Sequence, residues 1–126
     1  MPVIMVVDDE RPVREFLAQA LEENGYRVLQ AFNGRHALHV MSDAGSDGPD
    51  LIISDVMMPL VGGVELCRTI KGNPATADIP VVLMSAAAQR ATVGAHADAF
   101  IAKPFDLDTM DVLIMSVLSG HRAKPD

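Results

Sequence analysis

The stretch that decides the fold is VIMVVDDE, residues 3–10, where a short apolar run leads directly into three acidic side chains. Val3 to Val7 is continuous and rich in β-branched residues, which is typical of a strand buried on both faces of a sheet. Pro12 suits the first turn of a following helix, and Asn24-Gly25 suits its end. The apolar residues between them recur at the spacing of one helix face: Val13, Phe16, Leu17, Ala20 and Leu21.

The same alternation of strand and helix continues along the chain. Further strands are predicted over residues 26–31, 51–54, 81–84 and 99–102. Helices are predicted near 35–41 and 64–70, within 88–96, and in a last segment with one apolar face of Met110, Leu113, Ile114, Val117 and Leu118. Residues 43–49 are rich in Gly, Ser and Asp and are expected to form a flexible loop. Five such units predict an α/β fold, a doubly wound five-stranded parallel sheet with helices on both faces.

Composition limits the class of protein. The 126 residues, 49% apolar and 21% charged, fit one folded domain over residues 1–120 with a polar tail at 121–126. No apolar run approaches the ~20 residues of a membrane span, and no basic segment precedes the first strand, so neither a membrane segment nor a signal peptide is expected. The single cysteine, Cys67, cannot form an internal disulfide, which favours a cytoplasmic location. The net charge of −7 argues against nucleic-acid binding by this domain.

Chemically useful side chains follow four of the five predicted strands. In order along the chain they are Asp8-Asp9-Glu10, Asp55, Ser85 and Lys103-Pro104. In parallel sheets these carboxyl ends meet at one edge, where ligands bind. Each residue alone has an ordinary explanation, since Asp8 and Asp9 equally suit a helix N-terminus and Lys103 a solvated surface. The combination is what indicates a site.

Carboxylates gathered at one edge of a sheet repel one another and require positive charge nearby. Two carboxylates about 4 Å apart repel by roughly 4 kcal/mol at an effective dielectric constant near 20. Three of them require a cation or raised pKa values, and oxygen ligands with open positions suit Mg²⁺. A carboxylate beside Mg²⁺ can attack phosphorus and form an acyl phosphate. Lys103 would add positive charge and Ser85 a hydrogen-bond donor, which phosphoryl transfer requires.

Four blocks in this chain resemble the signatures of response-regulator receiver domains, the two-component signalling class that includes the chemotaxis regulators. They are Val6-Val7-Asp8-Asp9-Glu10, Asp55-Val56-Met57-Met58-Pro59, Met84-Ser85-Ala86 and Lys103-Pro104-Phe105. The blocks span essentially the whole chain in the family's order. The resemblance implies a flavodoxin-like (βα)5 fold with strand order 2-1-3-4-5. It also implies a signalling switch that carries an aspartyl phosphate.

The resemblance implies a role for each matching position. Asp55 would accept the phosphoryl group, and Ser85 and Lys103 would contact its oxygens. Mg²⁺ would be held directly by Asp55, Asp9 and the backbone carbonyl of Met57, and through water by Asp8. Ser85 and Phe100 would form the conformational switch, and the Lys103-Pro104 peptide bond would be cis.

Some positions depart from the family pattern. Ser85 replaces the commoner Thr, Phe100 a frequent Tyr, and Gly62 an Asp. The chain between Ser85 and Lys103 is shorter than usual by about one helical turn, roughly 3.6 residues. This shortening would fall on the helix expected within residues 88–96. We expect phosphorylation to order residues 88–97 and to expose a partner surface shared with the last helix.

The resemblance also implies the partners. A sensor histidine kinase or phosphotransfer protein would donate the phosphoryl group, and a downstream protein or effector domain would read the result. The domain would catalyse only its own phosphorylation and dephosphorylation. The alternative is a receiver-like interaction module that is never phosphorylated, which loss of the acidic pair, Asp55 or Lys103 would support. Two enzyme classes of similar fold fit poorly, since a haloacid-dehalogenase-like phosphatase needs Asp-x-Asp-x-Thr after the first strand and a flavodoxin needs a neutral, hydroxyl-rich loop.

Other reactive side chains have ordinary explanations. His36 and His39 are three residues apart on a predicted helix and could face one way as metal ligands. No third ligand lies near them in the sequence, so a solvated face is the simpler interpretation. Cys67 lies among apolar residues of a helix and is predicted to be a buried thiol.

Overall fold

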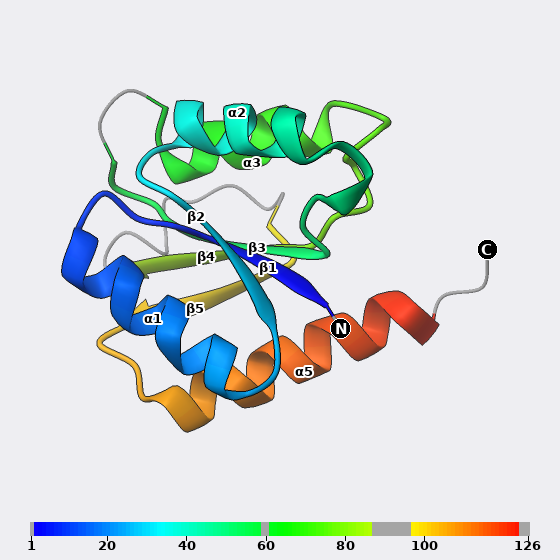
Figure 1. The fold of residues 1–126 in the computed structure, drawn as a ribbon. Coiled ribbons are helices and arrows are strands. Elements are labelled where there is room, and N and C mark those ends of the chain that lie inside the picture. Colours follow the sequence, from blue (N-terminus) through cyan, green and yellow to red (C-terminus); the bar gives the residue numbers. More distant parts are fainter. Residues whose placement is uncertain (1, 59–60, 87–96, 124–126) are drawn as a thin grey trace.

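The structure is a computed structural model that describes residues 2–58, 61–86 and 97–123. The strands β1 (Val3–Val7), β2 (Arg27–Ala31), β3 (Leu51–Asp55), β4 (Val81–Ala86) and β5 (Ala99–Lys103) form one sheet. All neighbouring strands are parallel. Their order is β2-β1-β3-β4-β5, so the predicted fold class and strand order are confirmed (Figure 1).

Helices cover both faces of the sheet. They are α1 (Arg11–Glu23), α2 (Gly34–Ala44), α3 (Gly63–Lys71) and α5 (Leu107–Ala123). Figure 1 shows α1 and α5 on one face and α2 and α3 on the other. The helix expected within residues 88–96 lies outside the described residues, as does most of the segment that phosphorylation is expected to order. In the part of the chain that is described, no helix is long and apolar enough to cross a membrane.

Alternate residues of the strands contribute to two separate cores. In β1, Ile4 and Val6 pack with α1 and α5, whereas Met5 and Val7 pack with α2 and α3. Every β1 and β3 residue is buried. This double burial explains why these strands are continuous apolar runs instead of alternating ones.

The apolar face predicted for the last helix is confirmed. Met110, Ile114 and Leu118 are buried, and Leu113 and Val117 pack beside them. The helix continues to Ala123, three residues into the segment assigned to the polar tail.

The first helix is rotated relative to the prediction. Phe16 was placed on its apolar face, but its side chain is 60% exposed, and Ala18 is buried in its stead beside Leu17. The rotation brings Arg14 to a half-buried position, where its guanidinium donates to a backbone carbonyl at the end of β1. A polar contact therefore takes part in setting the orientation of this helix, and apolar spacing alone does not reveal it.

The loop predicted over residues 43–49 is partly helical. Helix α2 continues to Ala44, and Gly45–Asp47 forms a 3-10 turn. Gly45 ends the helix with a φ of +55°, a left-handed conformation that favours glycine. The composition that suggested a loop therefore marks the end of a helix that is longer than predicted.

Candidate functional site

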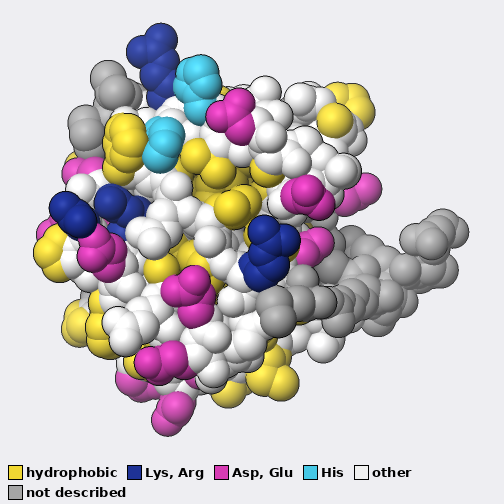
Figure 2. Space-filling model, in the orientation of Figure 1, with side chains coloured by type: hydrophobic (Ala, Val, Ile, Leu, Met, Phe, Trp, Pro, Cys, Tyr) yellow, Lys and Arg dark blue, Asp and Glu magenta, His cyan; other side chains and the backbone are white. Residues whose placement is uncertain are grey.

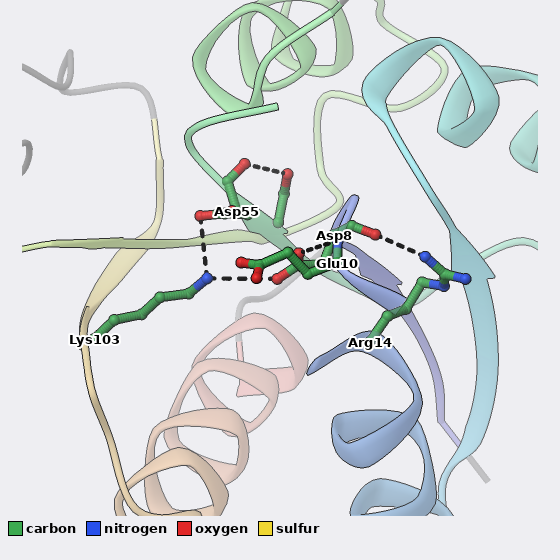
Figure 3. Close-up of polar contacts among 6 residues, drawn as sticks. Asp8, Glu10, Arg14, Asp55 and Lys103 are labelled. Atoms are coloured by element: carbon green, nitrogen blue, oxygen red, sulfur yellow. Dashed lines mark hydrogen bonds and ion pairs between the residues drawn. The ribbon is translucent and has the colours of Figure 1, made fainter. Parts of the chain in front are cut away.

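The strand pairings alone bring the predicted site residues together. Val7 is level with Ser54, so the next residues, Asp8 and Asp55, are neighbours at the carboxyl edge of the sheet. Asp55 is level with Met84 and Ala86 with Lys103, which carries the edge across β4 to β5. Figure 3 shows Asp8, Asp55 and Lys103 pointing toward one another.

Asp8 is the most firmly held member of the site. It is fully buried, its backbone N–H donates to the Ala31 carbonyl at 3.1 Å, and its Oδ1 accepts the Glu10 N–H at 2.9 Å. Its own carbonyl accepts a hydrogen bond from Arg14 Nη1 at 2.9 Å. The position of this carboxylate is therefore fixed by the end of β2 and by the first turn of α1.

Three carboxylates converge at this edge. Oxygens of Asp8, Asp9 and Asp55 lie within 4.8 Å of one another, with Asp9 exposed and the other two buried. An all-oxygen set with one side open to solvent fits a hard divalent cation such as Mg²⁺, which retains several waters. These residues could therefore hold a metal ion.

One ammonium group is shared by two of these carboxylates. Lys103 Nζ lies 3.4 Å from Asp55 Oδ1 and 3.5 Å from Asp8 Oδ2. Burial raises the pKa of Asp55, and repulsion from Asp8 adds to this increase, so that attraction to Lys103 only partly offsets it. Burial lowers the pKa of Lys103, but Asp55 and Asp8 together raise it above its ordinary value. The ammonium is thus stabilised by two anions, whereas the anions share one cation.

Ser85 presents an unpaired polar atom at the same edge. Its side chain is buried, and Ser85 Oγ has no hydrogen-bond partner among the described residues. Such groups normally find a partner. A hydroxyl one residue beyond the position level with Asp55 is suited to donate to an anion bound there.

Gly63 is a site residue that the sequence prediction missed. A Cβ at this position would lie 2.2 Å from the Asp55 carbonyl oxygen, so no other residue fits without a backbone shift. Its N–H donates to the Val56 carbonyl at 3.1 Å, which closes the loop after β3. The Gly62-Gly63 pair is visible in the sequence, but the sequence does not reveal how closely Gly63 approaches the Asp55 backbone.

The remaining predicted positions fall around this edge. Met57 is exposed beside Asp55, and Phe100 is half-buried against the core beneath α2 and α3. The Lys103-Pro104 peptide bond is cis, as the resemblance implied.

Two side chains away from this edge have structural roles. His36 Nδ1 accepts the Phe32 N–H at 3.1 Å, and the two rings stack. Cys67 is a buried free thiol, as predicted.

The comparisons with known proteins agree with this geometry. The family model described as the response regulator receiver domain matches residues 4–115. This chain belongs to the response regulator receiver family. Receiver domains are signalling domains of two-component systems and are phosphorylated on an Asp residue.

Curated relatives place the domain among regulators of two-component systems. The chain is 38% identical to the response regulator MprA of Mycobacterium tuberculosis over 98% of its length and 52% of that protein. It is also 38% identical to the phosphate regulon transcriptional regulatory protein PhoB of Pseudomonas aeruginosa, over 91% of the chain and 51% of that protein. The chain therefore spans about half the length of the curated relatives it matches.

Solved structures show the same fold. The receiver domain of a signal transduction histidine kinase from Syntrophus aciditrophicus superimposes with a TM-score of 0.86 at 35% identity, covering 100% of this chain and 96% of that one. The response regulator protein TrrA from Thermotoga maritima, solved in complex with Mg²⁺ and BeF, gives a TM-score of 0.81 at 31% identity. That superposition covers 93% of this chain and 99% of TrrA.

The crowded carboxylates lead to a prediction about stability and pH. The pKa of Asp55 is raised in the folded state, so its ionisation destabilises the fold above that pKa. Asp55→Asn should therefore raise the melting temperature of metal-free protein at neutral pH by about 3 °C, which corresponds to roughly 1 kcal/mol at this size. The gain should shrink as the pH falls through the raised pKa and vanish below about 3.9, the ordinary Asp value.

Thermal melts in EDTA from neutral to acid pH measure this difference. Asp43→Asn, which removes an exposed carboxylate on α2, serves as the control and should change the melting temperature little. A variant Asp55→Asn less stable than wild type at neutral pH would show that the ion pair with Lys103 outweighs burial and repulsion.

Proposed function

We propose that Asp55 is the phosphoacceptor of this receiver domain and that the phosphoryl group switches its partner-binding surface. The observation that carries the proposal is the contact of Asp55 with the Lys103 ammonium, with an unpaired hydroxyl, that of Ser85, at the end of the neighbouring strand β4. Lys103 Nζ is 3.4 Å from its carboxylate, and Ser85 Oγ has no partner within the described part of the chain. Both groups are of the type that binds phosphoryl oxygens.

The residues divide the chemistry between them. A carboxylate oxygen of Asp55 attacks phosphorus, a new P–O bond forms, and the bond to the donor breaks with its electron pair leaving on the donor. Lys103 and Ser85 donate to the phosphoryl oxygens. Mg²⁺, when bound, supplies positive charge against the incoming phosphate. Asp9, Asp55 and the Met57 carbonyl would hold it directly, and Asp8 through water.

The output follows from charge and packing. Phosphorylation adds about −1.5 to −2 charges and three acceptor oxygens at Asp55. The Ser85 hydroxyl would turn toward these oxygens, and the half-buried Phe100 ring on the next strand would fill the space released beneath β4. A downstream protein or effector domain would read the altered surface.

The proposal also covers which reactions the domain catalyses and where in the cell it acts. The reactions assigned to this domain are its own phosphorylation and the hydrolysis of its own aspartyl phosphate. The net charge of −7 supports contact with proteins and not with nucleic acid by this domain, and Figure 2 shows acidic side chains spread over the face seen there. Its one thiol, which is buried and free, is consistent with a cytoplasmic setting. A module that only binds partners has no need of a buried acidic cluster.

The acceptor is tested with a small phosphodonor. Wild-type protein incubated with acetyl phosphate and Mg²⁺ should gain the mass of one phosphoryl group, and the adduct should be absent without Mg²⁺. Intact mass spectrometry should show no adduct on Asp55→Asn, whereas Asp47→Asn, which alters an exposed carboxylate, should label like wild type. Equal labelling of Asp55→Asn would assign the phosphoryl group to another residue.

The phosphodonor protein should approach over α1. A groove of about 420 Å³ lies between α1 with the residue before it and the end of β5 with the loop that follows. It is lined by Glu10, Val13, Phe16, Leu17, Lys103, Pro104 and Phe105. Phe16 is 60% exposed there, and together with Val13, Pro104 and Phe105 it makes much of the groove's lining apolar. We propose that the phosphohistidine-bearing surface of a kinase or phosphotransfer protein packs on this groove.

Truncating Phe16 should slow phosphoryl transfer from a protein donor but not from a small-molecule donor. Burying a Phe side chain contributes ~1.5–3 kcal/mol, so Phe16→Ala should slow transfer from a phosphorylated kinase that labels wild type by about tenfold or more. The reaction with acetyl phosphate needs no such surface. Val112→Ala, which truncates a 68% exposed apolar residue on α5, is the matched control. Equal slowing with both donors would place the defect in the site and not in docking.

A further inference from the structure

We propose that Arg14 is a positioning residue for the acidic cluster, holding the turn between β1 and α1 so that Asp8 and Asp9 present their carboxylates to the metal. The inference rests on the proposed function, because it assumes that this cluster binds Mg²⁺. It assigns a task to a residue that lies outside the four signature blocks.

Arg14 bridges three elements of the fold. It lies in the first turn of α1, where its N–H donates to the Glu10 carbonyl at 3.0 Å. Its Nη1 donates to the Asp8 carbonyl at 2.9 Å, as Figure 3 shows, and its Nε donates to Gln30 Oε1 on β2 at 3.2 Å. Two donors of one rigid, planar guanidinium are thus directed at two partners, one directly after β1 and one on β2.

The direction of the Asp8 carbonyl affects where the carboxylate of Asp9 can lie. This carbonyl belongs to the same planar peptide unit as the Asp9 N–H, so its direction fixes where the Asp9 Cα leaves the strand. Asp9 is the exposed member of the cluster, with its carboxylate starting from that Cα. The Asp8 N–H and carboxylate are already held by Ala31 and Glu10. Arg14 supplies a further restraint by holding the Asp8 carbonyl.

Charge alone predicts the opposite effect. A guanidinium close to the cluster repels Mg²⁺, so a purely electrostatic role would make binding tighter when Arg14 is neutralised. A positioning role makes binding weaker, because the ligands lose their arrangement. Residues that orient metal ligands typically change affinity by about 10–100-fold when they are removed. The sign of the change therefore distinguishes the two roles.

The test is a Mg²⁺ titration of the whole chain, monitored by NMR through the amide resonance of Glu10. This N–H donates to Asp8 Oδ1 and therefore reports on the cluster. Arg14→Met should raise the Mg²⁺ dissociation constant about tenfold. Arg11→Met is the matched control, because it removes the same charge from the same turn of α1, where Arg11 is exposed and pairs with Glu15. It should leave the dissociation constant unchanged or slightly lower.

Two further variants keep the proposal falsifiable if Arg14→Met does not fold. Arg14→Lys retains one donor without the planar fork and should fall between wild type and Arg14→Met. Gln30→Ala removes an exposed partner of the fork and should weaken Mg²⁺ binding about twofold.

The outcomes separate this inference from the function beneath it. Unchanged or tighter Mg²⁺ binding in Arg14→Met, even with a lowered melting temperature, would overturn the positioning role. So would unchanged affinity in both Arg14→Lys and Gln30→Ala. A wild-type protein without saturable Mg²⁺ binding would instead overturn the proposed function, and this inference with it.

Discussion

Three carboxylates held at one sheet edge against a single ammonium group are the interaction on which this structure depends. Asp8 and Asp55 are buried, and Lys103 Nζ lies 3.5 Å from a carboxylate oxygen of Asp8 and 3.4 Å from one of Asp55. The raised pKa of Asp55 shows that burial and repulsion are not fully offset. A divalent cation held by these carboxylates would offset the repulsion between them. Under the proposed function, a phosphoryl group on Asp55 would add further negative charge at the same edge, beside Lys103.

The rest of the fold keeps this crowded arrangement in place. Parallel pairing aligns the ends of β1, β3 and β5, and cores on both faces make the strands rigid. Gly63 allows the following loop to pass within contact of the Asp55 backbone, and Arg14 anchors the turn that carries Asp8. These contacts stabilise a geometry that the carboxylates alone would oppose. Preorganisation of this kind is what phosphoryl transfer requires, since most of its catalysis is positioning and charge neutralisation.

The sequence predicted the sheet and the residues at its edge well, for a physical reason. Strands buried on both faces, such as β1 and β3, leave continuous apolar runs, and each predicted strand ends within two residues of its predicted limit. Asp8, Asp55 and Lys103 then followed from the rule that ligands bind at the carboxyl ends of parallel strands. Contacts between segments distant in sequence were not predictable. Phe16 was assigned to the buried face because its spacing matched, but the rotation of α1 that accompanies the Arg14 contact depends on the end of β1. The role of Gly63 could be recognised only from its distance to the Asp55 backbone, which no local sequence pattern indicates.

The central claim is that the acidic cluster of Asp8, Asp9 and Asp55 binds a divalent cation, which offsets the repulsion between its carboxylates. Thermal melts by circular dichroism test it directly, since the chain has no Trp to report by fluorescence. Millimolar Mg²⁺ should raise the melting temperature above that in NaCl of equal ionic strength, and at 100 times the dissociation constant the gain should be about 2.7 kcal/mol. Asp9→Ala should lose most of this gain. A melting temperature that Mg²⁺ does not change, or an equal rise in Asp9→Ala, would contradict the account.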